Sequence, residues 1–178
     1  MKKYTLINNI TGWIIFAAAS LTYLLTIEPT ASLWDCGEFI ASAFKLEVGH
    51  PPGNPVFMVI AMFFTLFAGS NVSTVAAMVN AMSALASAFT ILFLFWTITH
   101  LARKIIVRDG TGFTVPGIVA IIGSGVVGAL AFTFSDSFWF SAVEGEVYAT
   151  SSLFTAVVFW AILKWDDIAD EDYADRWL

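Results

Sequence analysis

The sequence predicts an all-α membrane protein with about four transmembrane helices and further short helices at one membrane face. Of its 178 residues, 58% are hydrophobic and 12% are charged, whereas about a quarter of the residues in soluble domains are charged. The charged residues are clustered, so long apolar segments carry none of them. Apolar runs of about 18 or more residues are typical of transmembrane helices, because about 20 helical residues cross the hydrocarbon core.

Five apolar segments follow one another along the chain, at about 8–27, 54–69, 74–102, 115–134 and 147–163. The first is longer than the apolar part of most signal peptides, and Glu28-Pro29 follows it in place of a small-residue cleavage site. We therefore interpret it as a retained transmembrane helix. Segment 54–69 would span about 24 Å as a helix, which is less than the hydrocarbon core of about 30 Å.

The basic residues indicate how segment 54–69 is placed, because Lys and Arg concentrate on the cytoplasmic side. If it crosses the membrane, Lys2 and Lys3 lie opposite the basic residues that follow it. If it stays at the outer face, all of them share the cytoplasmic side and Lys45 alone lies outside. The sequence thus predicts four crossings, both ends of this chain in the cytoplasm, and a re-entrant or juxtamembrane helix at 54–69. The basic residues that follow this segment are Arg103, Lys104, Arg108 and Lys164.

The predicted outer loop, 28–73, contains the polar stretch "WDCGEFIASAFKLEVGHPPGNP". Positions 33–46 fit an amphipathic helix lying along the membrane interface. The prolines after His50 end it, since proline has no amide hydrogen and disfavours a helical residue before it. The polar stripe of this predicted helix consists of Asp35, Glu38, Ser42 and Lys45.

A second group of acids lies between segments 115–134 and 147–163, in "SDSFWFSAVEGEVYA". With four crossings this group, which includes Glu144 and Glu146, shares the outer face with the first. Ionisable residues kept at the membrane are costly and are usually functional. One outer site is therefore possible, and it would be impossible if segment 54–69 crossed.

Several of these acids also fit a purely structural role. Ser32-x-x-Asp35 resembles a capping box, in which an acid bonds back to the start of a helix. Ser141-x-x-Glu144 has the same spacing, for a helix that starts near Ala142. The pattern alone therefore leaves structural and functional roles open.

The remaining polar residues of the first outer loop have structural interpretations too. Glu38 could be solvated or pair with a neighbour along the helix, and a single His50 is more often a satisfied polar residue than a ligand. The lone Cys36 permits no internal disulfide and has no metal-ligand spacing. We expect it to act as a small hydrophobic residue.

These two stretches carry a family resemblance. "WDCGEFIASAFKLEVGHPPGNPVF" resembles a D-x-G-E…HPPG-x-P block, and "FWFSAVEGEVYATSSLF" resembles a block built around W-x-x-A-V-x-x-E-V-Y-A. Both blocks are typical of a family of multi-pass bacterial membrane proteins that is related to a eukaryotic transmembrane protein O-mannosyltransferase. One departure is Cys36, where a small residue such as Ser is common.

The resemblance implies a GT-C-like transmembrane bundle in the bacterial inner membrane, with its site at the periplasmic face. Such glycosyltransferases take a sugar from a polyprenyl-phosphate donor, and the acceptor would be a hydroxyl of a protein or glycan. Membrane lipid surrounds the bundle, and no nucleic acid is expected as a partner. By the resemblance, Asp35 and Glu38 match the acids of the first block, His50 its histidine and Glu146 the acid of the second.

Within that framework we predict Asp35 as the general base that takes the proton of the acceptor hydroxyl. Glu38 and Glu146 would position the acceptor or a metal. The departing phosphate needs positive charge or donor hydrogen bonds. The candidates are Lys45, a protonated His50, a divalent metal held by Asp35, Glu38 or Glu146, or an arginine from the rest of a larger protein. The sequence does not decide whether a metal is required. The predicted substrate-binding residues are His50, Lys45, Glu144 and Tyr148.

Two other functions fit the same composition. A transporter would need polar groups along a path to both faces, whereas the acids here gather at one face. A non-catalytic subunit of an envelope assembly would use the acids only as helix caps.

The acidic tail "KWDDIADEDYADRWL" is most simply a solvated surface, and its last residues, "DRWL", resemble the start of another apolar segment. We therefore expect the chain to be the N-terminal part of a larger protein.

Overall fold

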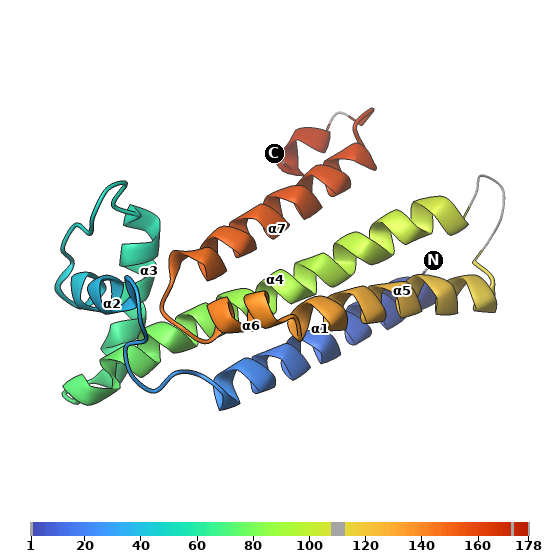
Figure 1. The fold of residues 1–178 in the computed structure, drawn as a ribbon. Helices are drawn as coiled ribbons and strands as arrows, with labels where there is room; N and C mark the ends of the chain where they lie inside the picture. Colours follow the sequence, from blue (N-terminus) through green and yellow to red (C-terminus); the bar gives the residue numbers. More distant parts are fainter. Residues whose placement is uncertain (1, 108–112, 172, 178) are drawn as a thin grey trace.

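The computed structural model describes residues 2–107, 113–171 and 173–177, and these residues contain helices and no strand. Four helices are long and apolar enough to cross a membrane, which confirms the predicted all-α membrane bundle. Figure 1 shows α4, the longest, running among the others. The four are α1 (Lys2–Leu25), α4 (Val75–Ile106), α5 (Val115–Thr133) and α7 (Val147–Asp166).

The core of the bundle forms where α4 packs against α1, α5 and α7. Small residues of α4, among them Ala84 and Ala88, are fully buried and let the helices approach closely. Ile91 and Phe95 fill the space one turn further on. The Tyr23 hydroxyl donates a 2.9 Å hydrogen bond to the Thr133 carbonyl and so joins α1 to the end of α5.

Gly125 sets the close packing of α5 on α4. A Cβ atom at this position would lie 2.5 Å from Thr99 Cγ2 and 2.7 Å from Phe95 Cε2, whereas one at Gly123 would have no neighbour within 4 Å. Both glycines are inside the same helix, so replacement by alanine brings the same gain in helix propensity at each.

We expect Gly125→Ala to destabilise the bundle by about 1–3 kcal/mol relative to Gly123→Ala, because overpacking forces the helices apart. Thermal unfolding of the two variants in the same detergent measures the difference. Equal melting temperatures would show that α4 and α5 are not packed through Gly125.

Three short helices gather at one end of the long ones: α2 (Cys36–Lys45), α3 (Pro55–Thr65) and α6 (Asp136–Ala142). α2 and α3 pack on the start of α4 through a second hydrophobic cluster. Figure 1 shows α3 running across the direction of the long helices instead of alongside them. The cluster contains Phe39, Ile40 and Ala43 of α2, Phe57, Met58 and Ala61 of α3, and Val75, Val79 and Met82 of α4.

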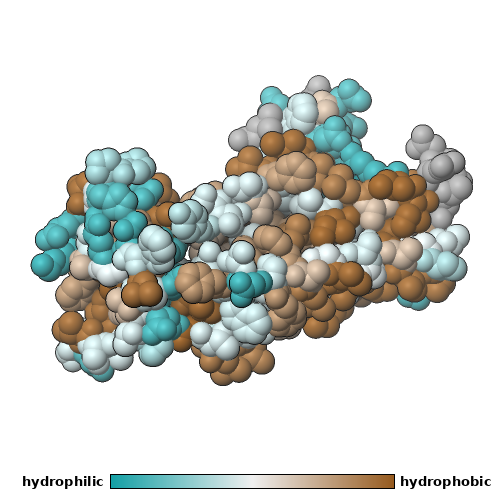
Figure 2. Space-filling view, viewed as in Figure 1, coloured by the Kyte–Doolittle hydropathy of each residue, from teal (hydrophilic) through white to brown (hydrophobic). Residues whose placement is uncertain are grey.

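The opposite end of the bundle is the basic one. Arg103 lies 2.7 Å from Asp167, and Lys104 pairs with Asp166, so these contacts join the ends of α4 and α7. Figure 2 shows hydrophilic surface mainly over α2 and its loop at one end and over the C-terminal segment at the other, with more hydrophobic surface between. This distribution suits a membrane-spanning bundle. The membrane face at which each end lies stays a prediction.

Two predicted helix starts are wrong. α2 begins at Cys36, where Asp35 makes no side-chain capping bond, and Ser32 contacts the Glu144 carboxylate instead. No helix starts near Ala142, since α6 ends there and α7 begins at Val147. The hydrogen bond between Ser32 and Glu144, which lie 112 residues apart, takes the place of both local caps.

The predicted polar stripe of the amphipathic helix is also partly wrong. Ser42 is buried, because α2 packs against both α3 and α4. Phe44 and Leu46, expected on the apolar side, are exposed. Leu46 already has left-handed backbone dihedral angles (φ 53°), so the helix stops one residue earlier than expected, at Lys45.

Candidate functional site

The two acidic groups of the sequence meet at the N-terminus of α2. Cys36, the first residue of that helix, has its Sγ atom 3.3 Å from Glu146 Oε1 and 3.8 Å from Glu144 Oε2. Asp35 directly precedes it, and the two glutamates lie just before α7. Residues more than a hundred positions apart thus form one site at the end opposite the basic residues.

The inner part of the site is a cluster of the half-buried Ser32 and the buried Cys36, Glu144 and Glu146. The Ser32 hydroxyl bonds Glu144 Oε2 and lies 3.1 Å from Cys36 Sγ. Both glutamates are buried, at 5% and 9% exposure. Burial raises the pKa of Glu146, and the nearby charges of Asp35 and Glu144 raise it further, against the Cys36 thiol that stabilises the carboxylate.

The outer part of the site is an exposed cluster of Asp35, Glu38 and His50. The His50 amide donates a 2.7 Å hydrogen bond to Glu38 Oε1, and its Nδ1 lies 3.1 Å from Oε2 of the same carboxylate. His50 Nε2 lies 3.9 Å from Asp35 Oδ2. The backbone bond and then the side-chain bond to His50 hold the pKa of Glu38 below its ordinary value. Glu38 therefore fastens the His50 loop onto α2 as a carboxylate.

The exposed cluster offers the residues that could hold a metal ion. One ligand atom from each of Asp35, Glu38 and His50 lies within 4.8 Å of the others. Two carboxylates and an imidazole suit several divalent transition metals. Glu146, which the sequence offered as a third ligand, faces the Cys36 thiol instead. An ion bound here would compete with the contact between Glu38 and His50.

Two predicted substrate-binding residues lie apart from these clusters. Lys45 is at the far end of α2, about 13 Å along the helix from Cys36, and its Nζ lies 4.0 Å from Glu47. Tyr148 is exposed and lines a groove of about 370 Å³ between the start of α3 and α7. Asn54 and Thr150 also line this groove.

Sequence reasoning missed two residues that organise the site. Cys36 was expected to be only a small hydrophobic residue, yet it joins both glutamates. Asn80 is completely buried, and its Nδ2 donates to the carbonyls of Glu28 and Thr30 at 2.6 and 3.0 Å. The sequence could have indicated Asn80, because it is an amide inside a long apolar segment. Polar groups in such segments are costly unless they have a hydrogen-bond partner.

The Cys36 thiol is expected not to react with maleimide in the folded protein at pH 7.5. It is 1% exposed, and burial together with the nearby glutamates raises its pKa to about 12, so the reactive thiolate is scarce. Mass spectrometry after labelling measures this, with Ser70→Cys, an exposed position, as the reactive control. Equally fast labelling of both thiols would show that the inner cluster is open.

Comparison with known proteins gives two kinds of match. The family model described as "Protein O-mannosyl-transferase TMEM260 N-terminal domain" matches residues 35–178. The protein O-mannosyl-transferase tmem260 of Dictyostelium discoideum is 26% identical over 145 residues, which are 82% of this chain and 16% of that protein. The mouse protein O-mannosyl-transferase TMEM260 is 28% identical over 154 residues, 86% of this chain and 19% of that protein. No solved structure matches significantly.

Proposed function

The chain belongs to the family of the protein O-mannosyl-transferase TMEM260 N-terminal domain, and from this premise we propose that it is part of a GT-C-type membrane glycosyltransferase. The chain spans less than a fifth of the length of either relative named above. The proposed enzyme transfers a sugar, mannose by analogy with the relatives' names, from a polyprenyl phosphate to an acceptor hydroxyl. The acceptor is a protein or glycan.

The observation that carries this proposal is the position of Asp35. Its carboxylate is exposed, adjoins the clamped pair of Glu38 and His50, and lies at the end of the bundle where Glu146 is also found. A hydroxyl is a poor nucleophile at neutral pH, so a transferase needs a positioned base of this kind.

The proposed step uses Asp35 as the base. The acceptor oxygen forms a bond to the anomeric carbon, its proton passes to Asp35, and the bond from the anomeric carbon to the phosphate oxygen breaks. The polyprenyl phosphate leaves with the electron pair of that bond. Glu38 holds His50 near the reacting groups, where a protonated imidazole can stabilise the anionic leaving group. Glu146 positions the start of α2 through Cys36.

Transport is less well supported, because it needs a polar path between the two faces. The core between the acids and the basic end contains apolar side chains such as Ile91 and Phe95 and buried hydroxyl groups such as that of Ser87, but in its described residues no acidic or basic side chain. In the part of the chain that the structure describes, the ionisable residues of the site stay at one end. We therefore favour a reaction at one membrane face.

We place this face at the periplasm of a bacterial inner membrane, since the basic residues at the other end favour the cytoplasm. A membrane-impermeant maleimide applied to intact spheroplasts tests the orientation. Ser70→Cys, in the same loop region as the site, is expected to react from outside. Labelling only after the membrane is opened would reverse the proposed orientation.

The function itself is tested in membranes that contain the full-length protein. We expect labelled mannose to pass from a polyprenyl-phosphate donor to a peptide rich in Ser and Thr, with membranes lacking the protein as the control. Transfer from a nucleotide sugar and not from the lipid-linked donor would contradict a GT-C-type reaction. Transfer from neither donor would favour the non-catalytic assembly role.

A further inference from the structure

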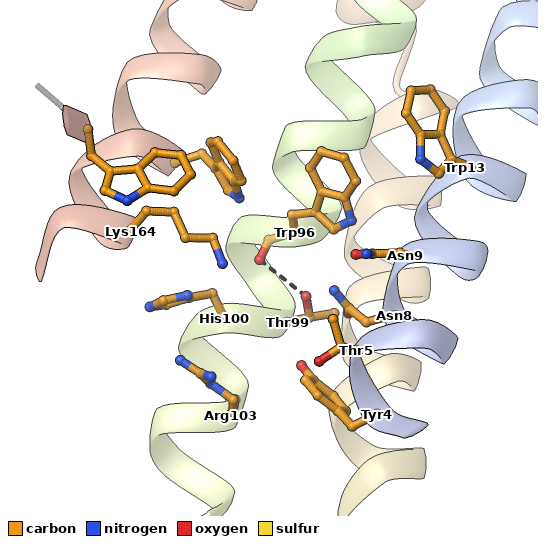
Figure 3. Close-up of a pocket in the computed structure, with 12 residues that line it drawn as sticks. Tyr4, Thr5, Asn8, Asn9, Trp13, Trp96, Thr99, His100, Arg103 and Lys164 are labelled. Carbon is orange, nitrogen blue, oxygen red and sulfur yellow. Dashed lines mark hydrogen bonds between the residues drawn. The ribbon is translucent and has the colours of Figure 1, made fainter. Parts of the chain in front are cut away.

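A cavity of about 440 Å³ opens at the basic end of the bundle, far from the acidic site. It lies between the first turns of α1, the C-terminal half of α4 and the end of α7. Figure 3 shows Lys164 extending from α7 toward α4, above His100, with Asn8 and Asn9 of α1 on the other side of α4. The transferase chemistry proposed above uses none of these residues.

The wall of this cavity carries a positive charge without a close partner. Arg103 pairs with Asp167 at 2.7 Å, and the carboxylate of Asp166 is taken up by Lys104. Among the described residues, no carboxylate lies within 4.0 Å of the half-buried Lys164. A charge held partly out of water in this way favours an anionic occupant.

Buried hydrogen-bonding groups in the same wall also lack partners. His100 is 5% exposed, and its Nε2 lies 3.4 Å from Asp167 Oδ1 without forming a hydrogen bond. The buried indole nitrogen of Trp96 has no hydrogen-bond partner either. Such groups are rare in native structures. Both nitrogen atoms are closed off from solvent, so they belong to a tightly packed part of the wall, and recognition of an occupant rests on Lys164.

Much of the remaining lining is aromatic, beside the polar residues Thr5, Asn8, Asn9 and Thr99. Trp13, Trp96, Trp160 and Trp177 contribute to it, and the Lys164 ammonium lies 5.5 Å from the centre of the Trp160 ring. Tryptophan is enriched where a membrane meets water, and the cavity is at the ends of three candidate spans. The occupant should therefore join an anionic group to an apolar body.

We propose that this cavity binds the phosphodiester head group of an anionic phospholipid from the adjacent leaflet. Basic pockets between transmembrane helices on the cytoplasmic side are known to bind such head groups. Lys164 would supply the charge, and its ammonium group would donate hydrogen bonds to the phosphate oxygens. Bound lipid would then fix the end of α7 against α1, which faces it across the cavity. This role is independent of the proposed glycosyl transfer.

Native mass spectrometry of the full-length protein tests the proposal with phosphatidylglycerol and phosphatidylcholine of identical acyl chains. We expect phosphatidylglycerol to bind at least about tenfold more tightly, and Lys164→Met to remove that preference. Lys2→Met removes the same charge from the same end outside the cavity and should leave the preference unchanged. Lys164→Arg keeps the charge and should restore it.

Three results would overturn the proposal. Equal binding of the two lipids would show that charge is not recognised. An equal loss in Lys2→Met would show a general electrostatic effect instead of a site. Displacement of the lipid by millimolar inorganic phosphate would identify free phosphate as the ligand. A lipid-free melting curve for Lys164→Met that matches the wild type separates lost binding from lost folding.

Discussion

Asp35→Asn is expected to lower the rate of sugar transfer by about 10²–10⁴-fold, because the amide cannot accept the proton of the acceptor hydroxyl. The substitution keeps the size and shape of the side chain. Asp35 makes no side-chain capping bond to α2 and is exposed, so the variant should fold normally. The measurement is single-turnover transfer in membranes that contain equal amounts of each protein.

The matched control is Asp136→Asn, which removes an exposed acid from the start of α6 at the same end of the bundle. It should transfer sugar at the wild-type rate. If Asp35→Asn retains full activity, the base must be another group, and Glu38 would be the next candidate. Its strong bonds to His50 make it a weaker base than a free carboxylate, since they stabilise its ionised form.

The placement of the acids could be predicted from the sequence because it depends on charge and segment length. The short segment 54–69 and the basic residues from Arg103 onward were enough to assign the groups around Asp35 and Glu146 to one end. Transmembrane helices are easily recognised from composition, and the positions of Lys and Arg restrict the orientation in which each helix crosses the membrane. The same reasoning indicated four transmembrane helices, and the described residues contain four helices that are long and apolar enough to cross a membrane.

The contacts inside the site could not be predicted, because they join residues through the fold. Ser32 fits a local cap in the sequence, but in the structure it bonds Glu144, 112 residues away. Cys36 has no spacing that indicates a ligand, and its contact with Glu146 exists only because α2 packs beside the start of α7. A local pattern is compatible with several partners, and tertiary packing decides among them.

We expect the buried carboxyl group of Glu146 to lower the stability of the protein at neutral pH while it supports the transfer reaction. Burial raises its pKa above that in the unfolded chain, about 4.3, so the folded state binds the proton more tightly. Its contribution to stability is therefore complete when the pH is below the pKa of Glu146 in the unfolded chain. This contribution is lost as the pH rises through the higher pKa of Glu146 in the folded protein. At neutral pH the carboxyl group at this position opposes folding.

Glu146→Gln is accordingly expected to melt at a higher temperature than the wild type at pH 7.5, and the difference should vanish as the pH approaches 4. Glu47→Gln, which removes an exposed carboxylate, is the control and should leave both the melting temperature and its pH dependence unchanged. Transfer by Glu146→Gln should fall by about 10²-fold, because the contact that positions Cys36 and the adjacent Asp35 is altered.

Lower stability of Glu146→Gln at neutral pH would contradict the raised pKa, and an unchanged transfer rate would make Glu146 a structural residue. Higher stability combined with lost transfer would distinguish a functional acid from a helix cap, since replacing a cap lowers stability. A buried acid that destabilises the fold and is nevertheless needed for the reaction follows the usual trade-off at active sites. That result would place Glu146 within the machinery that positions Asp35.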